Sequence, residues 1–187
     1  MKKATLVLTL IAMIAATFAF PVFASDTCDP SQDYLTIGRE QADNGDFDAA
    51  LVSANCGLSL DADSYELLML RAMVYCSTNR IELAIADMTT AIEIRPDSAY
   101  AYNARGWANY RLGNLELSLS NLNTAIELDE ELAYAYNNRG LVYQAMGEHA
   151  LAQSDFETAI DLGLVEPWAT INLYNLEFEM AKLEIGG

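Results

Sequence analysis

The sequence predicts an all-α protein in which pairs of antiparallel helices stack into a solenoid. Residues 101–106 read AYNARG, and residues 135–140 read AYNNRG, 34 positions later. On both sides of a polar turn, apolar and small residues recur at three- and four-residue spacing, in 99–112 and 115–128 and again in 133–146 and 149–162. This period indicates amphipathic helices. One helix pair cannot bury its apolar face alone, so repeats of this kind must stack into a continuous core.

The chain begins with the pattern of a secretory signal peptide. Lys2 and Lys3 are followed by an apolar run that ends in small residues before Ser25. This layout predicts a signal peptide in residues 1–24, followed by a lead-in over residues 25–30. The alternative is a membrane anchor, because the apolar run is nearly long enough to span a bilayer. No later segment is apolar enough to cross a membrane, so we expect export to the periplasm or the medium and no membrane partner after cleavage.

The charge of the chain excludes two classes of partner. The 187 residues include 27 acidic and 10 basic side chains, which give a formal net charge of −17. A field of this sign repels nucleic acid and anionic lipid. Disorder is not expected either, because hydrophobic residues make up 52% of the chain.

The repeat divides most of the chain into units of equal length. We expect four helix-turn-helix units within residues 31–166, namely 31–64, 65–98, 99–132 and 133–166, and a capping helix over 167–187. Small residues recur in the column Gly38, Ala72, Gly106 and Gly140. They allow the second helix of a unit to approach the first closely. Asp29 followed by Pro30 predicts the start of the first helix.

Catalytic and metal-binding patterns are hard to find. His149 is the only histidine, which excludes a site with several histidine ligands, and we expect it in a solvated turn. The acidic run DNGDFD at residues 43–48 lacks the glutamate that closes a calcium loop, so it is better interpreted as a turn. The sequence predicts no enzyme, no metal and no cofactor.

The chain contains three cysteines. Because we expect the protein to be exported, and disulfides persist in oxidising compartments, two of these cysteines can form a disulfide. Cys28 lies just before the first predicted helix and Cys56 near the end of the second, and antiparallel packing brings those two ends together. We therefore favour a Cys28–Cys56 disulfide with Cys76 free. The alternative is three buried or free thiols.

The 34-residue period, the helix-turn-helix layout and the aligned small residues together resemble the tetratricopeptide repeat (TPR) family. The signature of that family runs W-x2-L-G-x2-Y…A-x3-F…P. The unit at 133–166 resembles it most, through Tyr136, Gly140, Tyr143, Ala152 and Phe156. Tyrosine or leucine stands where the family has tryptophan, and only Pro96 keeps the final proline. The resemblance implies a right-handed α-solenoid of about four units with a C-terminal capping helix.

In that family the first helix of each pair lines a concave face that binds an extended peptide or a helix. The resemblance therefore implies a groove formed by Leu35, Arg39, Met69, Met73, Tyr100, Asn103, Trp107, Tyr110, Tyr134, Asn137, Leu141 and Gln144. Amides can hydrogen-bond a peptide backbone, and aromatic side chains offer anchors. The alternative is that these side chains pack on neighbouring helices.

Two functions follow from this interpretation. The first is an exported, non-enzymatic scaffold that binds a protein or peptide in the groove. The second is a structural or self-associating module, with the groove filled by its own capping helix or by another copy.

Overall fold

The computed structural model describes residues 28–164, 170–177 and 180, so the predicted signal peptide lies outside the described residues. The chain divides into one unit that ends at Gln32 and a second that begins at Asp33. In the first unit, the Asp29 carboxylate accepts hydrogen bonds from the backbone nitrogen and the hydroxyl of Ser31, at 2.9 and 2.8 Å. Asp29 thus closes a local turn, as short acidic side chains often do.

The prediction that Asp29 and Pro30 start the first helix is therefore wrong. That helix begins at Tyr34, and its N-cap is Asp33. The Asp33 carboxylate accepts a hydrogen bond of 3.1 Å from the backbone nitrogen of Thr36. A cap must lie next to the first helical residue, and the Asp29 side chain is already occupied by Ser31.

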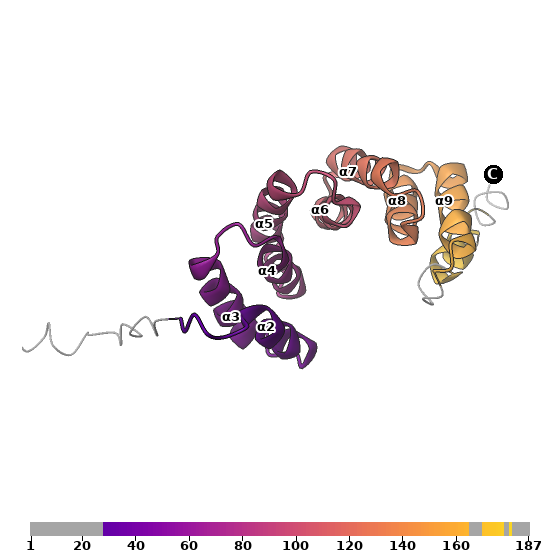
Figure 1. Ribbon diagram of the computed structural model, residues 1–187. Helices are drawn as coiled ribbons and strands as arrows, with labels where there is room; N and C mark the ends of the chain where they lie inside the picture. The colour runs from indigo at the N-terminus through magenta and orange to yellow at the C-terminus, as the bar shows by residue number, and fades with distance from the viewer. Residues whose placement is uncertain (1–27, 165–169, 178–179, 181–187) are drawn as a thin grey trace, which may run out of the picture. The chain divides into compact units, whose positions relative to one another are not determined.

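All regular secondary structure in the described residues of the second unit is α-helical, which confirms the all-α solenoid. The helices form four pairs: α2 (Tyr34–Asp43) with α3 (Phe47–Leu60), α4 (Tyr65–Ser77) with α5 (Ile81–Ile94), α6 (Ala99–Arg111) with α7 (Leu115–Leu128), and α8 (Ala133–Met146) with α9 (His149–Asp161). Each helix also packs against the next one along the chain. Within this unit, α4, α6 and α8 lie on the inner side of an arc, and α5 and α7 lie on the outer side (Figure 1).

Short polar turns separate the helices of each pair. Gly45, Gly113 and Gly147 have φ between 77° and 81° in three of these turns, a conformation that glycine adopts without strain. The acidic run at residues 43–48 spans the first turn, between the end of α2 and the start of α3, as predicted. Its Asp46 caps α3 by accepting a hydrogen bond of 3.2 Å from the backbone nitrogen of Ala49.

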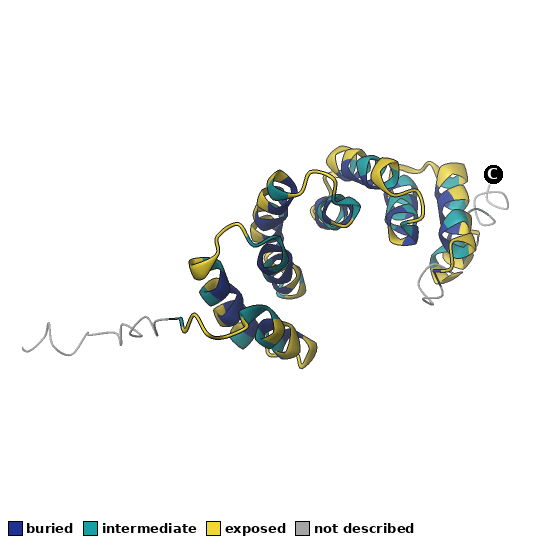
Figure 2. Cartoon of the chain, viewed as in Figure 1, coloured by how far each residue is buried: buried dark blue, intermediate teal, exposed yellow. Residues whose placement is uncertain are grey.

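The buried residues lie on the helix surfaces that face one another within and between the pairs (Figure 2). The glycine column explains how closely the pairs pack. A Cβ atom on Gly140 would lie 2.5 Å from Cε1 of Phe156, and one on Gly106 would lie 2.7 Å from Cγ of Leu122. Both large side chains are fully buried. The glycines therefore create the space into which the second helix inserts its largest residue.

Three arginines, 34 residues apart, connect successive pairs. Nε and Nη2 of Arg71 donate to Asp87 at 2.7 Å, while Nη1 donates to Asn55 on the preceding helix. Arg139 repeats this arrangement with Asp155. These hydrogen bonds to carboxylates raise the pKa of both guanidinium groups despite their partial burial.

Among the described residues, the middle arginine has no carboxylate partner. Nε of Arg105 donates to the amide oxygen of Asn121 at 2.7 Å, and Nη1 donates to the Thr89 hydroxyl. Burial lowers the pKa of Arg105, and the neighbouring Tyr102 only partly opposes that shift. The geometry of the repeat is kept here while its ion pair is lost.

Residues 170–177 are helical and continue the stack beyond α9. Leu176 is fully buried and packs in one cluster with Ala152 and Phe156. The described part of the predicted capping helix therefore covers the apolar face of the last pair, as the end of a solenoid requires.

Candidate binding groove

Two adjoining cavities lie along the first helices of the pairs. The first has a volume of about 550 Å³ and is lined by α4, α6 and α8, together with Met88 of α5. The second has a volume of about 590 Å³ and is lined by α6, α8, Leu164 and Asn172. Trp107, Tyr134 and Asn138 line both cavities, so the two form one continuous groove.

Most of the residues expected in the groove line these cavities. They are Met69, Met73, Tyr100, Asn103, Trp107, Tyr134, Asn137 and Leu141. Leu35, Arg39, Tyr110 and Gln144 are not among the lining residues of either cavity. Tyr110 instead stacks on Trp107, with ring centroids 5.4 Å apart and planes inclined by 25°. The Tyr110 ring thus packs against the Trp107 ring.

Several lining residues were missed by the sequence interpretation. Arg111 and Asn138 come from the same first helices as the predicted residues, whereas Met88 comes from a second helix. Arg111 and Asn138 lie one helical turn beyond Trp107 and Tyr134, so the helical period could have identified them. Met88 could not have been found in this way, because it lies on α5, a second helix, outside the pattern of first-helix positions.

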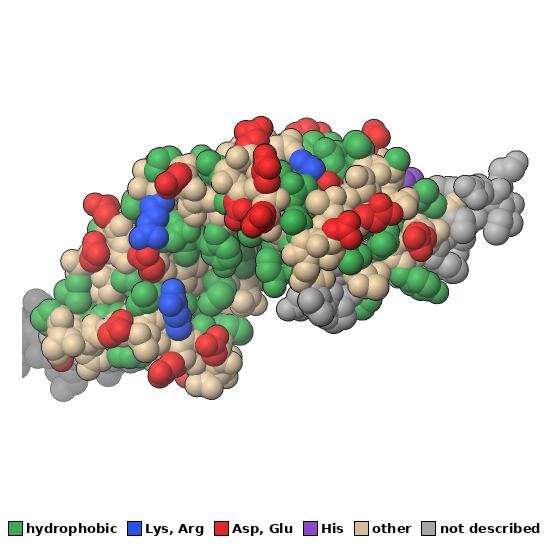
Figure 3. Space-filling model, turned by 45° about the vertical axis from the view of Figure 1, so that its right-hand side comes forward, with side chains coloured by type: hydrophobic (Ala, Val, Ile, Leu, Met, Phe, Trp, Pro, Cys, Tyr) green, Lys and Arg blue, Asp and Glu red, His purple; other side chains and the backbone are tan. Residues whose placement is uncertain are grey.

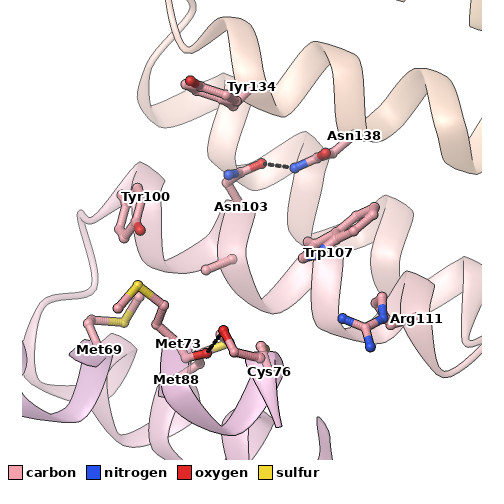
Figure 4. A pocket seen from close by; sticks show the side chains of 12 residues that line it. Met69, Met73, Cys76, Met88, Tyr100, Asn103, Trp107, Arg111, Tyr134 and Asn138 are labelled. Carbon is pink, nitrogen blue, oxygen red and sulfur yellow. Dashed lines mark hydrogen bonds between the residues drawn. The ribbon is translucent and has the colours of Figure 1, made fainter. Parts of the chain in front are cut away.

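The aromatic and sulfur-containing side chains give the first cavity an apolar surface. Tyr100 and Tyr134 are 58% and 51% exposed, although both are large side chains with apolar rings. Figure 4 shows them on one side of the cavity, with Met69 and Met73 below and Trp107 opposite. Exposed aromatic rings beside flexible thioethers form a surface that can adapt to an apolar partner.

Two of the amide side chains contact neighbouring helices, which is the alternative that the sequence analysis left open. Asn103 and Asn137 are only 7% and 8% exposed. The amide oxygen of Asn103 accepts a hydrogen bond of 2.9 Å from the amide nitrogen of Asn138. The amide oxygen of Asn137 accepts one of 3.0 Å from Asn172. Each amide oxygen therefore links one first helix to the next.

The groove differs in charge from the rest of the molecule. Carboxylates are spread over the face shown in Figure 3, where few basic side chains are seen. Among the described lining residues of the two cavities, Arg111 carries the only formal charge. Its Nη2 donates to the amide oxygen of Asn79 at 2.9 Å, which holds the guanidinium at the edge of the first cavity.

Cys76 is a free cysteine in the first cavity. Burial raises the pKa of its thiol, and the nearby Arg111 cation partly opposes that rise. Its thiolate fraction near neutral pH is therefore smaller than that of an exposed cysteine.

The Cys28–Cys56 disulfide stays a prediction that peptide mapping can test. Non-reducing digestion of the purified protein should yield one peptide pair joined through Cys28 and Cys56, with Cys76 alkylated. Because the bond closes a long loop in the unfolded chain, its reduction should lower the free energy of unfolding by about 3–4 kcal/mol. A bridge that contains Cys76 would contradict the assignment.

The described residues contain no group of three or more histidine, cysteine, aspartate or glutamate side chains placed to hold a metal ion. His149 is the first residue of α9 and is only partly exposed, with a buried Nδ1 that has no hydrogen-bond partner in the described part of the chain. The expectation of a solvated turn residue is thus wrong for His149. Across that same part, no helix is long and apolar enough to cross a membrane.

Comparison with known protein families finds the repeat directly in the sequence. Residues 72–113 and 108–147 match a family model described as TPR repeat, and residues 133–162 match one described as tetratricopeptide repeat. No curated protein matches the chain.

Several solved structures have a similar fold. A thermophilic TPR protein from Thermus thermophilus is 26% identical over 82% of this chain and 84% of its own, with a TM-score of 0.71. The MamA protein is 28% identical over 80% of this chain and 85% of its own, with a TM-score of 0.66. The first TPR domain of Spaghetti (RPAP3), solved with the HSP90 peptide SRMEEVD, is 23% identical over 65% of this chain and 96% of its own, with a TM-score of 0.60.

Proposed function

Because the protein is a member of the tetratricopeptide repeat family, whose members typically serve as non-enzymatic interaction scaffolds, we propose that it binds a protein segment in the groove along α4, α6 and α8. The continuous pair of cavities carries the proposal. A groove of about 550 and 590 Å³ with aromatic, sulfur and amide walls can bury the side chains of a peptide. One solved relative of the same fold holds a peptide, which agrees with this function.

The alternative is a groove filled by the capping helix or by another copy. Residues 170–177 pack on Phe156, and their Asn172 contributes to the second cavity only. Among the described residues, the first cavity receives no side chain from this segment. This arrangement favours an external partner for the first cavity.

We also propose that the partner is met outside the cytoplasm. The basic start, the apolar run and the small residues before Ser25 form a signal-peptide pattern. N-terminal sequencing of the protein recovered from the exported fraction should begin at Ser25. Recovery of an intact N-terminus in the membrane fraction would instead support an anchor.

Peptide selection followed by substitution of Trp107 tests the groove. A random dodecapeptide display library is selected on the purified protein, and the peptide with the highest affinity is synthesised. Trp107→Ala should weaken binding of this peptide by at least about 1–2 kcal/mol, because central aromatic residues carry much of an interface's binding energy. Fluorescence anisotropy measures the affinity.

The matched control is Leu117→Ala on α7, which removes another exposed apolar side chain, 58% accessible. It should leave the affinity unchanged. Equal affinities for wild type and Trp107→Ala would contradict groove binding. So would a Trp107→Ala protein that unfolds while its folded fraction binds normally, since Trp107 would then serve only the core.

A further inference from the structure

Sulfur-containing side chains are concentrated in the first cavity. Its lining residues include Met69, Met73, Cys76 and Met88. Beyond the predicted signal peptide the chain has five methionines, and three of the five line this one cavity. The free cysteine Cys76 lies there with them. Packing alone does not require this concentration, because leucine fills a core position about as well as methionine does.

The repeat shows that folding does not need sulfur at these four positions. In place of Met69 and Met88, the other three units have Leu35, Ala54, Asn103, Leu122, Asn137 and Phe156. The columns of Met73 and Cys76 also lack sulfur in the other units. Sulfur at all four positions of one unit is therefore a departure from the repeat. Local departures from an otherwise consistent pattern are expected at functional sites.

The geometry of α4 places three of these side chains on one face. Met73 and Cys76 follow Met69 by four and seven residues, which is the spacing of a single helix face. Neighbours at three- and four-residue spacing have Cβ atoms about 5–6 Å apart, within reach of one another's side chains. Figure 4 shows the three side chains together on the α4 side of the cavity.

Met88 adds a fourth sulfur-containing side chain from α5. It is buried in the same apolar cluster as Met69, and Cys76 packs against that cluster. Met73 is 42% exposed, so the group can be reached from the open side of the cavity. Four sulfur-containing side chains from two helices thus lie together at the wall of a cavity that a small ion can enter.

The chemistry of this wall suits a soft metal ion. Thioether and thiolate sulfur are soft ligands that bind Cu(I), whereas harder ions prefer imidazole, carboxylate or carbonyl groups. No histidine or carboxylate is among the described residues that line the cavity. The sequence predicted no metal because histidine and acidic patterns were missing, and Cu(I) needs neither. The net charge of −17 also attracts cations to the molecule.

We infer that the first cavity holds a Cu(I) site whose ligands are the thioethers of Met69, Met73 and Met88 and the sulfur of Cys76. This site goes beyond the proposed function and does not rest on it. The S–H bond of Cys76 breaks when the S–Cu bond forms, and the proton passes to solvent. The resulting thiolate offsets the charge of Arg111, which lines the same cavity.

The proton on Cys76 makes metal binding depend on pH. Burial raises the pKa of this thiol, so the proton is present at neutral pH and Cu(I) must displace it. The affinity for Cu(I) therefore increases as the pH is raised from about 6 to about 8. Cys76→Ser removes the titrating group, and the variant should lose this dependence.

Competition with the chelator bicinchoninate under anaerobic conditions tests the site. Cu(I) is supplied as its acetonitrile complex with ascorbate, without thiol reductants, and the loss of the coloured chelate reports the metal bound by the protein. Met73→Leu and Cys76→Ser should each weaken binding at least about tenfold, since even the partners of metal ligands contribute about that much. The matched control is Met146→Leu on α8, which is 37% exposed and outside the lining of either cavity. It should leave the affinity unchanged.

Two further measurements identify the ligands. Leucine conserves the volume of methionine, so circular dichroism of Met73→Leu should match the wild type. The copper X-ray absorption spectrum of the wild-type complex should show sulfur neighbours alone. Wild-type Cu(I) affinity in Met73→Leu, equal losses in Met73→Leu and Met146→Leu, or nitrogen and oxygen neighbours around the copper would each overturn the inferred site. So would a wild-type protein that takes no Cu(I) from the chelator.

Discussion

Replacing Gly140 with leucine is expected to lower the free energy of unfolding by at least about 3 kcal/mol. A Cβ atom at this position would already lie 2.5 Å from Cε1 of Phe156 and 2.7 Å from Cδ1. The ring is fully buried between helices, so it has no space into which to move. Overpacking of this kind forces the backbones apart. Urea denaturation followed by circular dichroism measures the change.

The matched control is Ala145→Leu, which adds apolar volume to the same helix at an exposed position. It should change stability by less than about 0.5 kcal/mol. Because the clash is with the ring, combining Gly140→Ala with Phe156→Leu should recover part of the loss that Gly140→Ala alone causes. A Gly140→Leu protein with wild-type stability would contradict the packing described for α8 and α9.

Replacing Arg139 with methionine is expected to cost about 3–5 kcal/mol. The substitution leaves Asp155, whose side chain is 7% exposed, without its two hydrogen bonds of 2.7 and 2.8 Å. Removing one member of a buried ion pair leaves an uncompensated charge in the protein interior. The same substitution at Arg95 breaks a pair whose side chains are 49% and 37% exposed. Arg95→Met should therefore cost less than about 1 kcal/mol, and equal losses at the two positions would contradict this account.

The middle arginine allows the opposite experiment. Asn121→Asp would give Arg105 the carboxylate that Asp87 and Asp155 give to the other two arginines. Hydrogen bonds to charged groups contribute more than neutral ones, so we expect a gain of about 1 kcal/mol in urea denaturation. Destabilisation by Asn121→Asp would show that the hydrogen bond from the Asn121 amide nitrogen to the carbonyl oxygen of Leu117 matters more than the added charge.

The fold could be predicted because the repeat fixes which residues must be small. Gly106 and Gly140 recur 34 residues apart, and the helices on either side of each turn end within one residue of the predicted bounds. The column therefore indicated where the second helix approaches closely, and in the structure Leu122 and Phe156 occupy that place. Contacts within one unit, or between adjacent units, can be predicted from the sequence in this way, because every unit repeats the same contact.

Departures from the repeat were harder to predict. Arg71, Arg105 and Arg139 recur at the same spacing, and their partners follow 16 residues later, so this column could have been recognised. Whether an amide side chain contacts a partner or the next helix depends on the angle between helices, which the sequence does not state. Asn103 and Asn137 were expected to face a peptide, and half of each amide group is instead bound to the next helix.

Hydrogen–deuterium exchange with and without the display-selected peptide tests the central claim, that the inner helices form the binding surface. Amide exchange reports local opening, which a bound segment suppresses in the elements it contacts. Slower exchange should appear in α4, α6 and α8, which carry Met73, Trp107 and Tyr134. Protection confined to the outer helices α5, α7 and α9 would place the binding surface on the opposite face and contradict the account.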